Sequence, residues 1–460
     1  MQADDTITAV ATPPGVGGIA VIRLSGPAAE QIGKTIFRGA HNHPPKFTTH
    51  RLYHGHIVSA VDSAVIDEVL AVLMRAPHSY TGEDVLEIHG HGGYLLPQRI
   101  LAETIRAGAR PAAPGEFTKR AFLNNRLDLS QAEAVADMIN ARTERGLELA
   151  RSQYQRQLTA EITALREGIV DAIARLEAAI EFAADDPDIA DDMSIPNQLQ
   201  EIGHEVNSLI TTYREGKIYR HGVSLVIAGR TNVGKSSLLN HLLGEKRAIV
   251  AASPGTTRDF IEETVNIHDI PVRLTDTAGI RSTADAVEQE GIAMVWQRID
   301  AADAVLLVFD GSENLTTADR QIVAKLAGKV LIPLVNKVDL PRMLAPEVLS
   351  DLLPNHQAIW ISAKHGTGID ELLQAIHHLF LATERETSAG TVITSLRHKL
   401  ALEKASFFIC QAMARAARGG APELAATDLQ DALEALEEIT GRTADETILE
   451  RIFAKFCVGK

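Results

Sequence analysis

An eight-residue stretch, GRTNVGKS at residues 229–236, limits the folds open to this chain more than any other feature. It follows an apolar β-branched run, SLVIAG, and precedes a helix-like run, KSSLLNHLLG. In that context the pattern is typical of a loop whose backbone N–H groups hold phosphates at a helix start. We expect Lys235 to reach the β- and γ-phosphate oxygens and Ser236 to bind Mg²⁺. The loop requires a strand–loop–helix unit of an α/β domain.

Three further segments follow predicted strands in the order of a guanine-nucleotide site: DTAG at 276–279, NKVD at 336–339 and SAK at 362–364. Asp276 is placed to hold the Mg²⁺ shell, and Asp339 can accept hydrogen bonds from guanine N1–H and N2–H₂, which adenine lacks. Parallel sheets bind ligands at the carboxyl ends of their strands, so these segments should meet. The predicted GTP and GDP contacts are Asn232, Val233, Gly234, Lys235, Ser236, Ser237, Ala251, Ala252, Ser253, Pro254, Gly255, Thr256, Thr257, Asp276, Thr277, Ala278, Gly279, Asn336, Lys337, Val338, Asp339, Ser362, Ala363 and Lys364.

The residue after DTAG raises a question about catalysis. Ras-like enzymes place a glutamine there to orient the attacking water. This chain has Ile280, whose side chain cannot orient water. Either hydrolysis is slow, or the catalytic group comes from elsewhere in the chain.

The pattern of strand-like and helix-like segments along the chain predicts three domains. From residue 224 short apolar runs alternate with helix-length segments, which is typical of a parallel doubly wound sheet. Helical texture flanks that part on both sides, and mixed α/β texture precedes it. We expect a multidomain chain: an N-terminal α+β domain (1–121), an all-α domain (122–218 and 380–460), and an α/β Ras-like P-loop domain (219–379) inserted into the all-α one.

Several helix ends can be predicted from local signals. Ser130 with Glu133, and Thr443 with Glu446, have the spacing of a capping box. Gly441 is expected to end the helix before the last one.

Composition narrows the class of protein. A net charge of −15 argues against a surface that coats nucleic acid as a whole, because phosphate binding needs lysine and arginine. Two cysteines, Cys410 and Cys457, do not support a disulfide framework and suit a reducing cytosol. We expect Cys410, in an apolar helical run, to be part of a core. No signal peptide and no run of apolar residues long enough to cross a membrane is visible.

Together these segments resemble one family along the whole chain. The P-loop carries Asn232, and a switch-like GTTRD follows it, as in the potassium-dependent GTPases. Outside the P-loop domain, TITAVATPPGVGGIAVIRLSG, TGEDVLEIHGHGG, PGEFTKRAFLNNRLDLSQAEAVADMI and a terminal FCVGK are similar to the MnmE (TrmE) family of bacterial tRNA modification GTPases.

The resemblance implies an answer to the question of catalysis. Glu288 occupies the position of the family's acidic residue, which would orient the water through a second water. A potassium ion would take the place of an arginine finger, stabilising charge that develops between the phosphates. The implied K⁺ ligands are Asn232, Ala251, Ser253 and Thr256, and the implied Mg²⁺ ligands are Ser236 and Thr257.

The resemblance also implies a folate site and partners. A tetrahydrofolate derivative, the 5-formyl or methylene form, would bind in the N-terminal domain at Arg23, Glu87, Arg126 and Lys460, with Arg126 replacing a family lysine. Two interpretations of Cys457, close to Lys460, stay open: a role in one-carbon chemistry, or a small buried apolar residue. The implied enzyme is a cytoplasmic homodimer that works on tRNA with the flavoprotein MnmG (GidA).

Other functions stay open on the sequence alone. A ribosome-assembly GTPase would need an RNA-binding module or a second P-loop, and neither is visible. A GTP-switched scaffold would bind GTP without needing hydrolysis for its effect. A series of arginines, Arg142, Arg145, Arg151 and Arg156, is either a phosphate-facing stripe or a solvated helix face.

Overall fold

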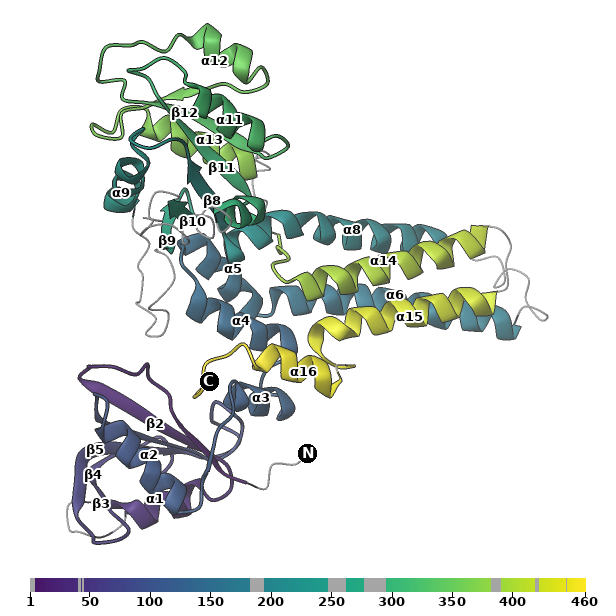
Figure 1. The fold of residues 1–460 in the computed structure, drawn as a ribbon. Helices are drawn as coiled ribbons and strands as arrows, with labels where there is room; N and C mark the ends of the chain where they lie inside the picture. Colours follow the sequence, from purple (N-terminus) through teal and green to yellow (C-terminus); the bar gives the residue numbers. More distant parts are fainter. Residues whose placement is uncertain are drawn as a thin grey trace. The chain divides into compact units, whose positions relative to one another are not determined.

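The computed structural model describes residues 5–39, 43, 45–182, 194–246, 262–276, 295–381, 390–417, 422–443 and 445–460 (Figure 1). The chain divides into two compact units. The first comprises Met1–Ala136, Gln153–Ile173 and Leu429–Lys460, and the second comprises Asp137–Ser152 and Ala174–Asp428. Each unit is described by itself.

The first unit contains a seven-stranded sheet with the strand order β3-β4-β5-β6-β2-β1-β7. Neighbouring strands are antiparallel, except that β1 and β7 are parallel. The strands are β1 (Ile7–Val10), β2 (Ile19–Ser25), β3 (Phe37–Gly39), β4 (Leu52–Val58), β5 (Val65–Met74), β6 (Val85–His91) and β7 (Arg110–Pro111). The predicted strands at 18–24 and 65–74 are therefore confirmed.

Two helices cover one face of this sheet. Helices α1 (Ala29–Ile36) and α2 (Leu96–Arg106) pack on the face where Ile22, Leu24 and Ile88 are buried. Along β5, side chains alternate between buried and more exposed, as expected for a strand with one side in the core. The other face carries the paired side chains of Arg23 and Glu87, and near them Ile7 and Ala9 of β1 are buried against Phe117.

Helices make up most of the remainder of the first unit. They are α3 (Glu116–Leu123), α4 (Leu129–Asn140), α6 (Gln157–Phe182), α15 (Pro422–Thr440) and α16 (Glu446–Phe453), of which α4, α6 and α15 continue into the second unit. As predicted, α15 ends before Gly441, whose φ of +85° is the left-handed conformation that favours glycine.

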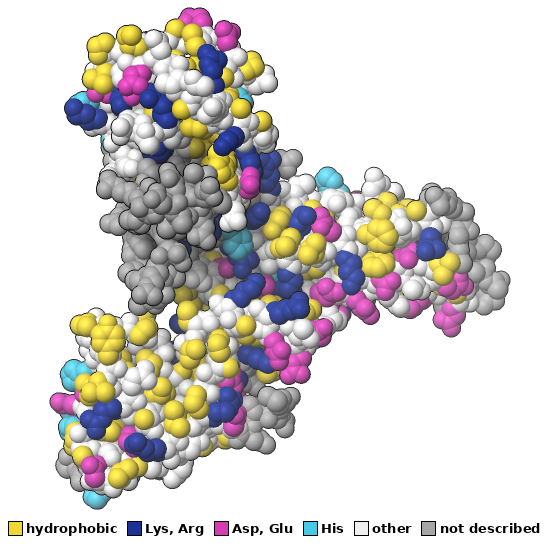
Figure 2. Space-filling view, viewed as in Figure 1, with side chains coloured by type: hydrophobic (Ala, Val, Ile, Leu, Met, Phe, Trp, Pro, Cys, Tyr) yellow, Lys and Arg dark blue, Asp and Glu magenta, His cyan; other side chains and the backbone are white. Residues whose placement is uncertain are grey.

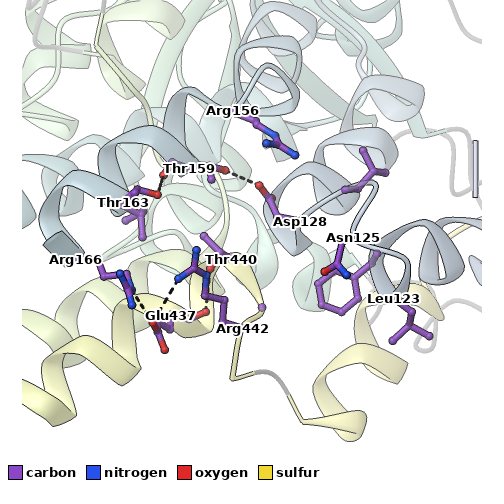
Figure 3. Close-up of a pocket in the computed structure, with 14 residues that line it drawn as sticks. Leu123, Asn125, Asp128, Arg156, Thr159, Thr163, Arg166, Glu437, Thr440 and Arg442 are labelled. Carbon is purple, nitrogen blue, oxygen red and sulfur yellow. Dashed lines mark hydrogen bonds and ion pairs between the residues drawn. The ribbon is translucent and has the colours of Figure 1, made fainter. Parts of the chain in front are cut away.

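Both predicted capping boxes were wrong by a few residues. Helix α4 begins at Leu129, so Ser130 and Glu133 lie inside it. The cap is Asp128, whose Oδ1 accepts from Gln131 N at 2.8 Å, while Gln131 Oε1 accepts from Asp128 N at 3.1 Å. Asp128 Oδ2 also accepts from the Thr159 hydroxyl at 2.8 Å (Figure 3). An aspartate two residues upstream of the predicted serine thus holds the helix start.

The predicted cap of the last helix was also misplaced. Asp445, not Thr443, caps α16, since its Oδ1 accepts from Ile448 N at 2.8 Å. Aspartate is among the best N-cap residues, and Asp445 directly precedes the helix, so it takes the cap position in place of Thr443.

The second unit contains a six-stranded sheet with the order β13-β12-β11-β8-β10-β9. Its strands are β8 (Val223–Ala228), β9 (Glu262–Ile267), β10 (Ile270–Asp276), β11 (Ala304–Asp310), β12 (Leu331–Asn336) and β13 (Ile359–Trp360). All neighbours are parallel except β9, which is antiparallel to β10. The prediction of a parallel sheet missed this edge strand.

Helices cover both faces of this sheet, which confirms the doubly wound arrangement. They are α9 (Lys235–Lys246), α11 (Thr317–Lys325), α12 (Pro346–Leu352) and α13 (Ile369–Phe380). Leu225 and Ile227 of β8 pack in one core with α9 and α13, and Val226 and Ala228 pack in another. The fold is therefore the predicted one: an N-terminal α+β part, helical segments and a P-loop α/β domain.

Long helices complete the second unit: α5 (Glu144–Tyr154), which ends in the first unit, α8 (Ser194–His221) and α14 (Leu396–Ala417), with α8 packed along α14. Cys410 on α14 is exposed, so its predicted place in a core was wrong. Cys410 lies on the outward face of the helix. The apolar composition of the segment does not show which face each residue occupies.

Two surface properties bear on function. None of the described helices is long and apolar enough to cross a membrane. The face shown in Figure 2 carries acidic and basic side chains interspersed, without a broad region of one sign. A polyanion would therefore have to find a local site on that face.

Candidate functional site

The phosphate loop connects β8 to α9 and has the backbone that its sequence requires. Gly229, Asn232 and Gly234 have φ values of +147°, +66° and +99°. A Cβ on Gly234 would lie 2.2 Å from Asn336 Nδ2, so no larger residue fits there without displacing the asparagine. Asparagine tolerates the left-handed conformation better than most residues, which suits it to position 232.

Asn336 at the end of β12 ties the phosphate loop to the segment expected to contact the base. Its Nδ2 donates to Val233 O at 2.8 Å, and its Oδ1 accepts from Ala363 N at 2.9 Å. The side chain is 3% exposed. Since both ends of the carboxamide are used, the phosphate loop, NKVD and SAK are fixed relative to one another.

Lys235 lies over the phosphate loop. Its Nζ donates to Gly229 O at 2.9 Å and to Arg230 O at 2.8 Å. Burial lowers the pKa of Lys235, and the charge of Asp276 opposes that shift. Two neutral carbonyl oxygens do not balance a buried ammonium charge, so an anionic phosphate oxygen at this loop is strongly favoured.

Oxygen donors suitable for Mg²⁺ lie at the other side of the loop. Ser236 Oγ donates to Asp276 Oδ2 at 2.8 Å. Hydroxyl and carboxylate oxygens together with phosphate oxygens are the ligands that Mg²⁺ takes in nucleotide sites. The residues present therefore fit this ion.

Asp339 occupies the position expected to recognise the base. Its Oδ1 accepts from Ser362 Oγ at 2.7 Å, and His365 Nε2 lies 3.9 Å from Oδ2. The hydrogen bond from Ser362 is the largest cause of a lowered pKa of Asp339. The carboxylate is therefore ionised and held in one orientation near neutral pH, as a guanine acceptor must be.

Asp310 is a residue of this site that sequence reasoning missed. It ends β11, is 5% exposed, and accepts from Lys337 Nζ at 2.5 Å. Burial raises the pKa of Asp310, but hydrogen bonds from Lys337 and Ser312 outweigh it and the pKa is lowered. The signal was an aspartate at the end of an apolar strand, AVLLVFD, beside the strand that carries NKVD.

The other described contacts predicted for the nucleotide lie around the same edge. Val233 is buried, Val338 N donates to Ile361 O at 3.2 Å, and Ser237 and Lys364 are exposed. The predictions for Ala251, Ala252, Ser253, Pro254, Gly255, Thr256, Thr257, Thr277, Ala278, Gly279 and Glu288 lie outside the described residues.

In the first unit, three of the four predicted folate positions come from segments that meet. Arg23 Nε donates to Glu87 Oε1 at 2.8 Å, and its Nη1 donates to Gly459 O at 3.3 Å, next to Lys460. The Arg23 guanidinium lies 5.4 Å from the centroid of the Tyr80 ring. Arg126 lies exposed in the turn between α3 and α4, and none of its described contacts joins it to the other three.

The C-terminal tail is held beside this pair. Gly459 has a φ of +97°, and a Cβ there would lie 2.6 Å from Val10 O. Cys457 is exposed, and its carbonyl oxygen accepts from Lys460 N at 3.3 Å. The Arg23–Glu87 pair thus contacts the C-terminal tail that also carries Cys457.

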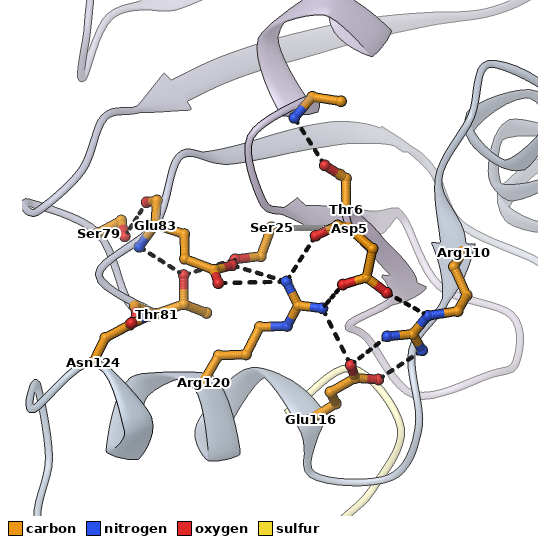
Figure 4. A network of polar contacts seen from close by, with 11 residues as sticks. Asp5, Thr6, Ser25, Ser79, Thr81, Glu83, Arg110, Glu116, Arg120 and Asn124 are labelled. Carbon is orange, nitrogen blue, oxygen red and sulfur yellow. Dashed lines mark hydrogen bonds and ion pairs between the residues drawn. The ribbon is translucent and has the colours of Figure 1, made fainter. Parts of the chain in front are cut away.

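A buried arginine of α3 holds a network of three carboxylates in the first unit (Figure 4). Arg120 is 3% exposed and donates to Asp5 Oδ1 at 2.6 Å, to Glu83 Oε2 at 3.1 Å and to Glu116 Oε1 at 3.2 Å. Arg110 pairs with the outer side of Asp5 and Glu116. The network fixes the start of the N-terminal strand to α3.

Comparison with known proteins finds matches to one family over nearly the full length of the chain. The model "MnmE helical domain" matches residues 129–457, and "GTP-binding protein TrmE N-terminus" matches residues 6–126. The chain is 48% identical over 456 residues to a protein of Syntrophus aciditrophicus named tRNA modification GTPase MnmE, covering 99% of each. It is 46% identical to the protein of that name from Geobacter metallireducens, covering 100% of each.

The chain belongs to the MnmE family. Among solved structures, a single-residue variant of Era from Aquifex aeolicus, bound to GDP and aluminium fluoride, matches with 27% identity and a TM-score of 0.29. That match covers 40% of this chain and 66% of Era. Membership in the MnmE family therefore rests on the sequence matches.

Proposed function

We propose that this chain is a tRNA modification GTPase that acts in the cytoplasm, where tRNA is found. Its kinship to full-length relatives of that name supports the proposal. The geometric support is the Asn336 carboxamide, which joins the phosphate loop to the base-recognition segment. As a member of this family the chain is a GTPase and uses Mg²⁺.

The described residues would divide the work of nucleotide binding. Backbone N–H groups of the phosphate loop and the Lys235 ammonium hold the phosphate oxygens, and Asp339 accepts the guanine donors. Ser236 and Asp276 would hold Mg²⁺, which supplies charge stabilisation at the phosphates when bound. Asp310 keeps Lys337 in place beside the base.

We propose that hydrolysis depends on potassium and on Glu288. Asn232, with Ala251, Ser253 and Thr256, would bind K⁺, and Thr257 would complete the Mg²⁺ site. Glu288 would orient the attacking water, in place of the glutamine that Ile280 replaces. The support is the sequence resemblance, together with the position of Asn232 in the phosphate loop, where its side chain is exposed and its backbone is left-handed.

The folate step is proposed for the first unit. Arg23 and Glu87, with Lys460 and Arg126, would bind a tetrahydrofolate derivative, because an arginine–glutamate pair matches carboxylates and a pterin edge. With MnmG the enzyme would add an aminomethyl-type (carboxymethylaminomethyl) group at C5 of the wobble uridine of certain tRNAs. Cys457, exposed at the same edge, would lie close to that one-carbon unit.

Homodimer formation is also proposed, together with the domain boundaries 1–121, 122–218 with 380–460, and 219–379. Large apolar side chains are exposed near one end of the first-unit sheet: Val16 at 91%, Ile19 at 68%, Tyr94 at 71% and Leu95 at 69%. Apolar side chains gathered on a surface are typical of protein interfaces.

Nucleoside mass spectrometry of total tRNA tests the proposed function. Bacteria that lack their own MnmE would carry this gene or an empty vector. The C5-modified wobble uridine should return only with the gene. If it stays absent when the gene is expressed with the matching MnmG and the protein binds GTP, the proposed function is wrong.

A further inference from the structure

A pocket in the first unit is not used by the nucleotide or the proposed folate site. It has a volume of about 510 Å³ and is lined by the turn from α3 to α4, one face of α6 and the end of α15 (Figure 3). Cavities of this size hold small ligands or one portion of a larger one. All its lining residues belong to the same compact unit.

Three arginines and two carboxylates line this pocket: Arg156, Arg166, Arg442, Asp128 and Glu437. Both carboxylates have internal partners. Asp128 accepts from the α4 backbone and from Thr159, and Glu437 accepts from Arg166 Nε at 2.7 Å. The lining therefore has an excess of positive charge.

Two of the arginines, by contrast, have N–H groups that are available to a ligand. Arg156 donates through Nε to Gln131 Oε1 at 3.1 Å, and no hydrogen bond of its two Nη groups occurs among the residues the structure describes. Arg442 lies 3.8 Å from Glu437, beyond hydrogen-bond distance, and its side chain is 57% exposed. These planar donor groups suit oxyanions, phosphate above all.

Arg156 is also held in an unfavourable backbone conformation. Its φ is +69°, in the left-handed region that is unfavourable for a non-glycine residue. A glycine would adopt this conformation without strain, so the arginine stands here against the local backbone preference. Backbone strain of this kind is concentrated at ligand-binding and active sites.

The arrangement along α6 indicates an extended ligand. Arg156 precedes the helix and Arg166 lies ten residues on, about 15 Å of helix rise. Thr159 and Thr163 lie between them, and their hydroxyls donate to Asp128 and to Thr159 O, which leaves oxygen lone pairs as acceptors. A ribose 2′-OH is a donor that such lone pairs can receive, and DNA lacks it.

We propose that this pocket binds phosphate groups and ribose of a single-stranded RNA segment. The inference rests on the proposed action on tRNA and adds the place of contact. Phosphates spaced along a strand match cationic groups at two ends of the pocket better than one phosphate does. A free mononucleotide offers the same chemistry and is the alternative source.

The test is fluorescence anisotropy of the full chain with a labelled anticodon stem-loop RNA, across a series of KCl concentrations. Arg156→Gly removes the guanidinium and relieves the backbone, so the melting temperature should hold or rise. Arg442→Gln removes charge at the other end. Each should weaken binding about fourfold at 0.15 M salt and reduce the slope of log K against log salt by about 0.7.

The matched control is Arg99→Gln, an exposed arginine of α2 in the same unit but outside the pocket, which should bind RNA as the wild type does. A DNA copy of the stem-loop should bind more weakly than RNA, and Thr163→Val should narrow that gap. If pocket and control variants bind RNA alike, RNA is not the ligand and the proposal is overturned. Titration with uridine monophosphate then shows whether a free nucleotide occupies the pocket.

These outcomes can be told apart from failure of the proposed function. The binding series compares variants with wild type and needs no modification activity. If modification fails in cells but the binding differences appear, the pocket stands and the assigned reaction does not. If modification succeeds and the variants bind RNA normally, only the pocket is wrong.

Discussion

At the scale of single residues, Asn336 shows how one side chain can join two distant segments. Its carboxamide donates to the phosphate loop and accepts from the segment after β13, and the space it needs exists only because residue 234 is glycine. The two residues are 102 positions apart in the sequence. The sequence motifs predicted both residues as nucleotide contacts, but not that each depends on the other.

Gly234→Ala should therefore weaken nucleotide binding. The added Cβ, 2.2 Å from Asn336 Nδ2, displaces the asparagine and distorts a backbone at φ +99°. We expect at least about a tenfold rise in the Kd for GDP, measured with a fluorescent GDP analogue, because one buried hydrogen bond is worth about 1–3 kcal/mol when broken. Gly244→Ala on α9 is the control, since a Cβ there meets nothing within 4 Å, and its Kd should not change.

Arg120→Met should destabilise the first unit by about 3 kcal/mol or more, because it leaves three carboxylates without their buried partner. Arg110→Met, at the exposed side of the same network, should cost less than about 1 kcal/mol. Chemical denaturation followed by circular dichroism measures both. Similar losses for the two variants would contradict the importance of burial.

The same network predicts how stability depends on pH. Burial raises the pKa of Glu116, but hydrogen bonds from Arg110 and the backbone of Ala113 outweigh it, and the pKa lies below its ordinary 4.5. The unfolded chain therefore binds more protons at acidic pH, so stability falls as pH drops below about 4.5. Arg120→Met should lose stability less steeply over that range. An unchanged slope in the melting temperature against pH would contradict this coupling.

At the scale of helices and strands, the sequence predicted most elements and misplaced several of their ends. Apolar runs with β-branched residues identified five strands of the second-unit sheet. β9 was missed because four of the six residues in EETVNI are polar and the strand lies on an edge, where one side has no partner strand. The helix caps were missed because two candidates lay within two residues, and only the backbone geometry chooses between them.

The observed cap of α4 gives a prediction at this scale. Asp128→Ala should destabilise the protein by about 1 kcal/mol, because Gln131 N and the Thr159 hydroxyl lose their acceptor. Ser130→Ala should be neutral or slightly stabilising, since the buried Ser130 hydroxyl has no partner among the described residues. Thermal unfolding of the two variants compares them directly. A larger loss in Ser130→Ala would restore the predicted capping box.

At the scale of the whole molecule, local signals cannot predict which distant segments meet. Arg23 reaches Gly459, 436 residues away, and Arg166 pairs with Glu437, 271 residues away. Each pair depends on how helices and strands pack, which residue spacing does not encode. The pocket between α6 and α15 was invisible in the sequence for that reason, although one of its arginines, Arg156, was noticed.

The proposed potassium site predicts a property of the intact enzyme. Hydrolysis of GTP should be faster in KCl than in NaCl at equal ionic strength, because a fixed K⁺ would stabilise the charge that develops between the phosphates. Asn232→Gly removes the side-chain ligand but keeps a residue that accepts the φ of +66°, so the loop should still bind GDP. We expect this variant to hydrolyse GTP at equal rates in both salts. A wild type without preference for KCl would remove the potassium hypothesis, whereas a variant that keeps the preference would remove only Asn232 as a ligand.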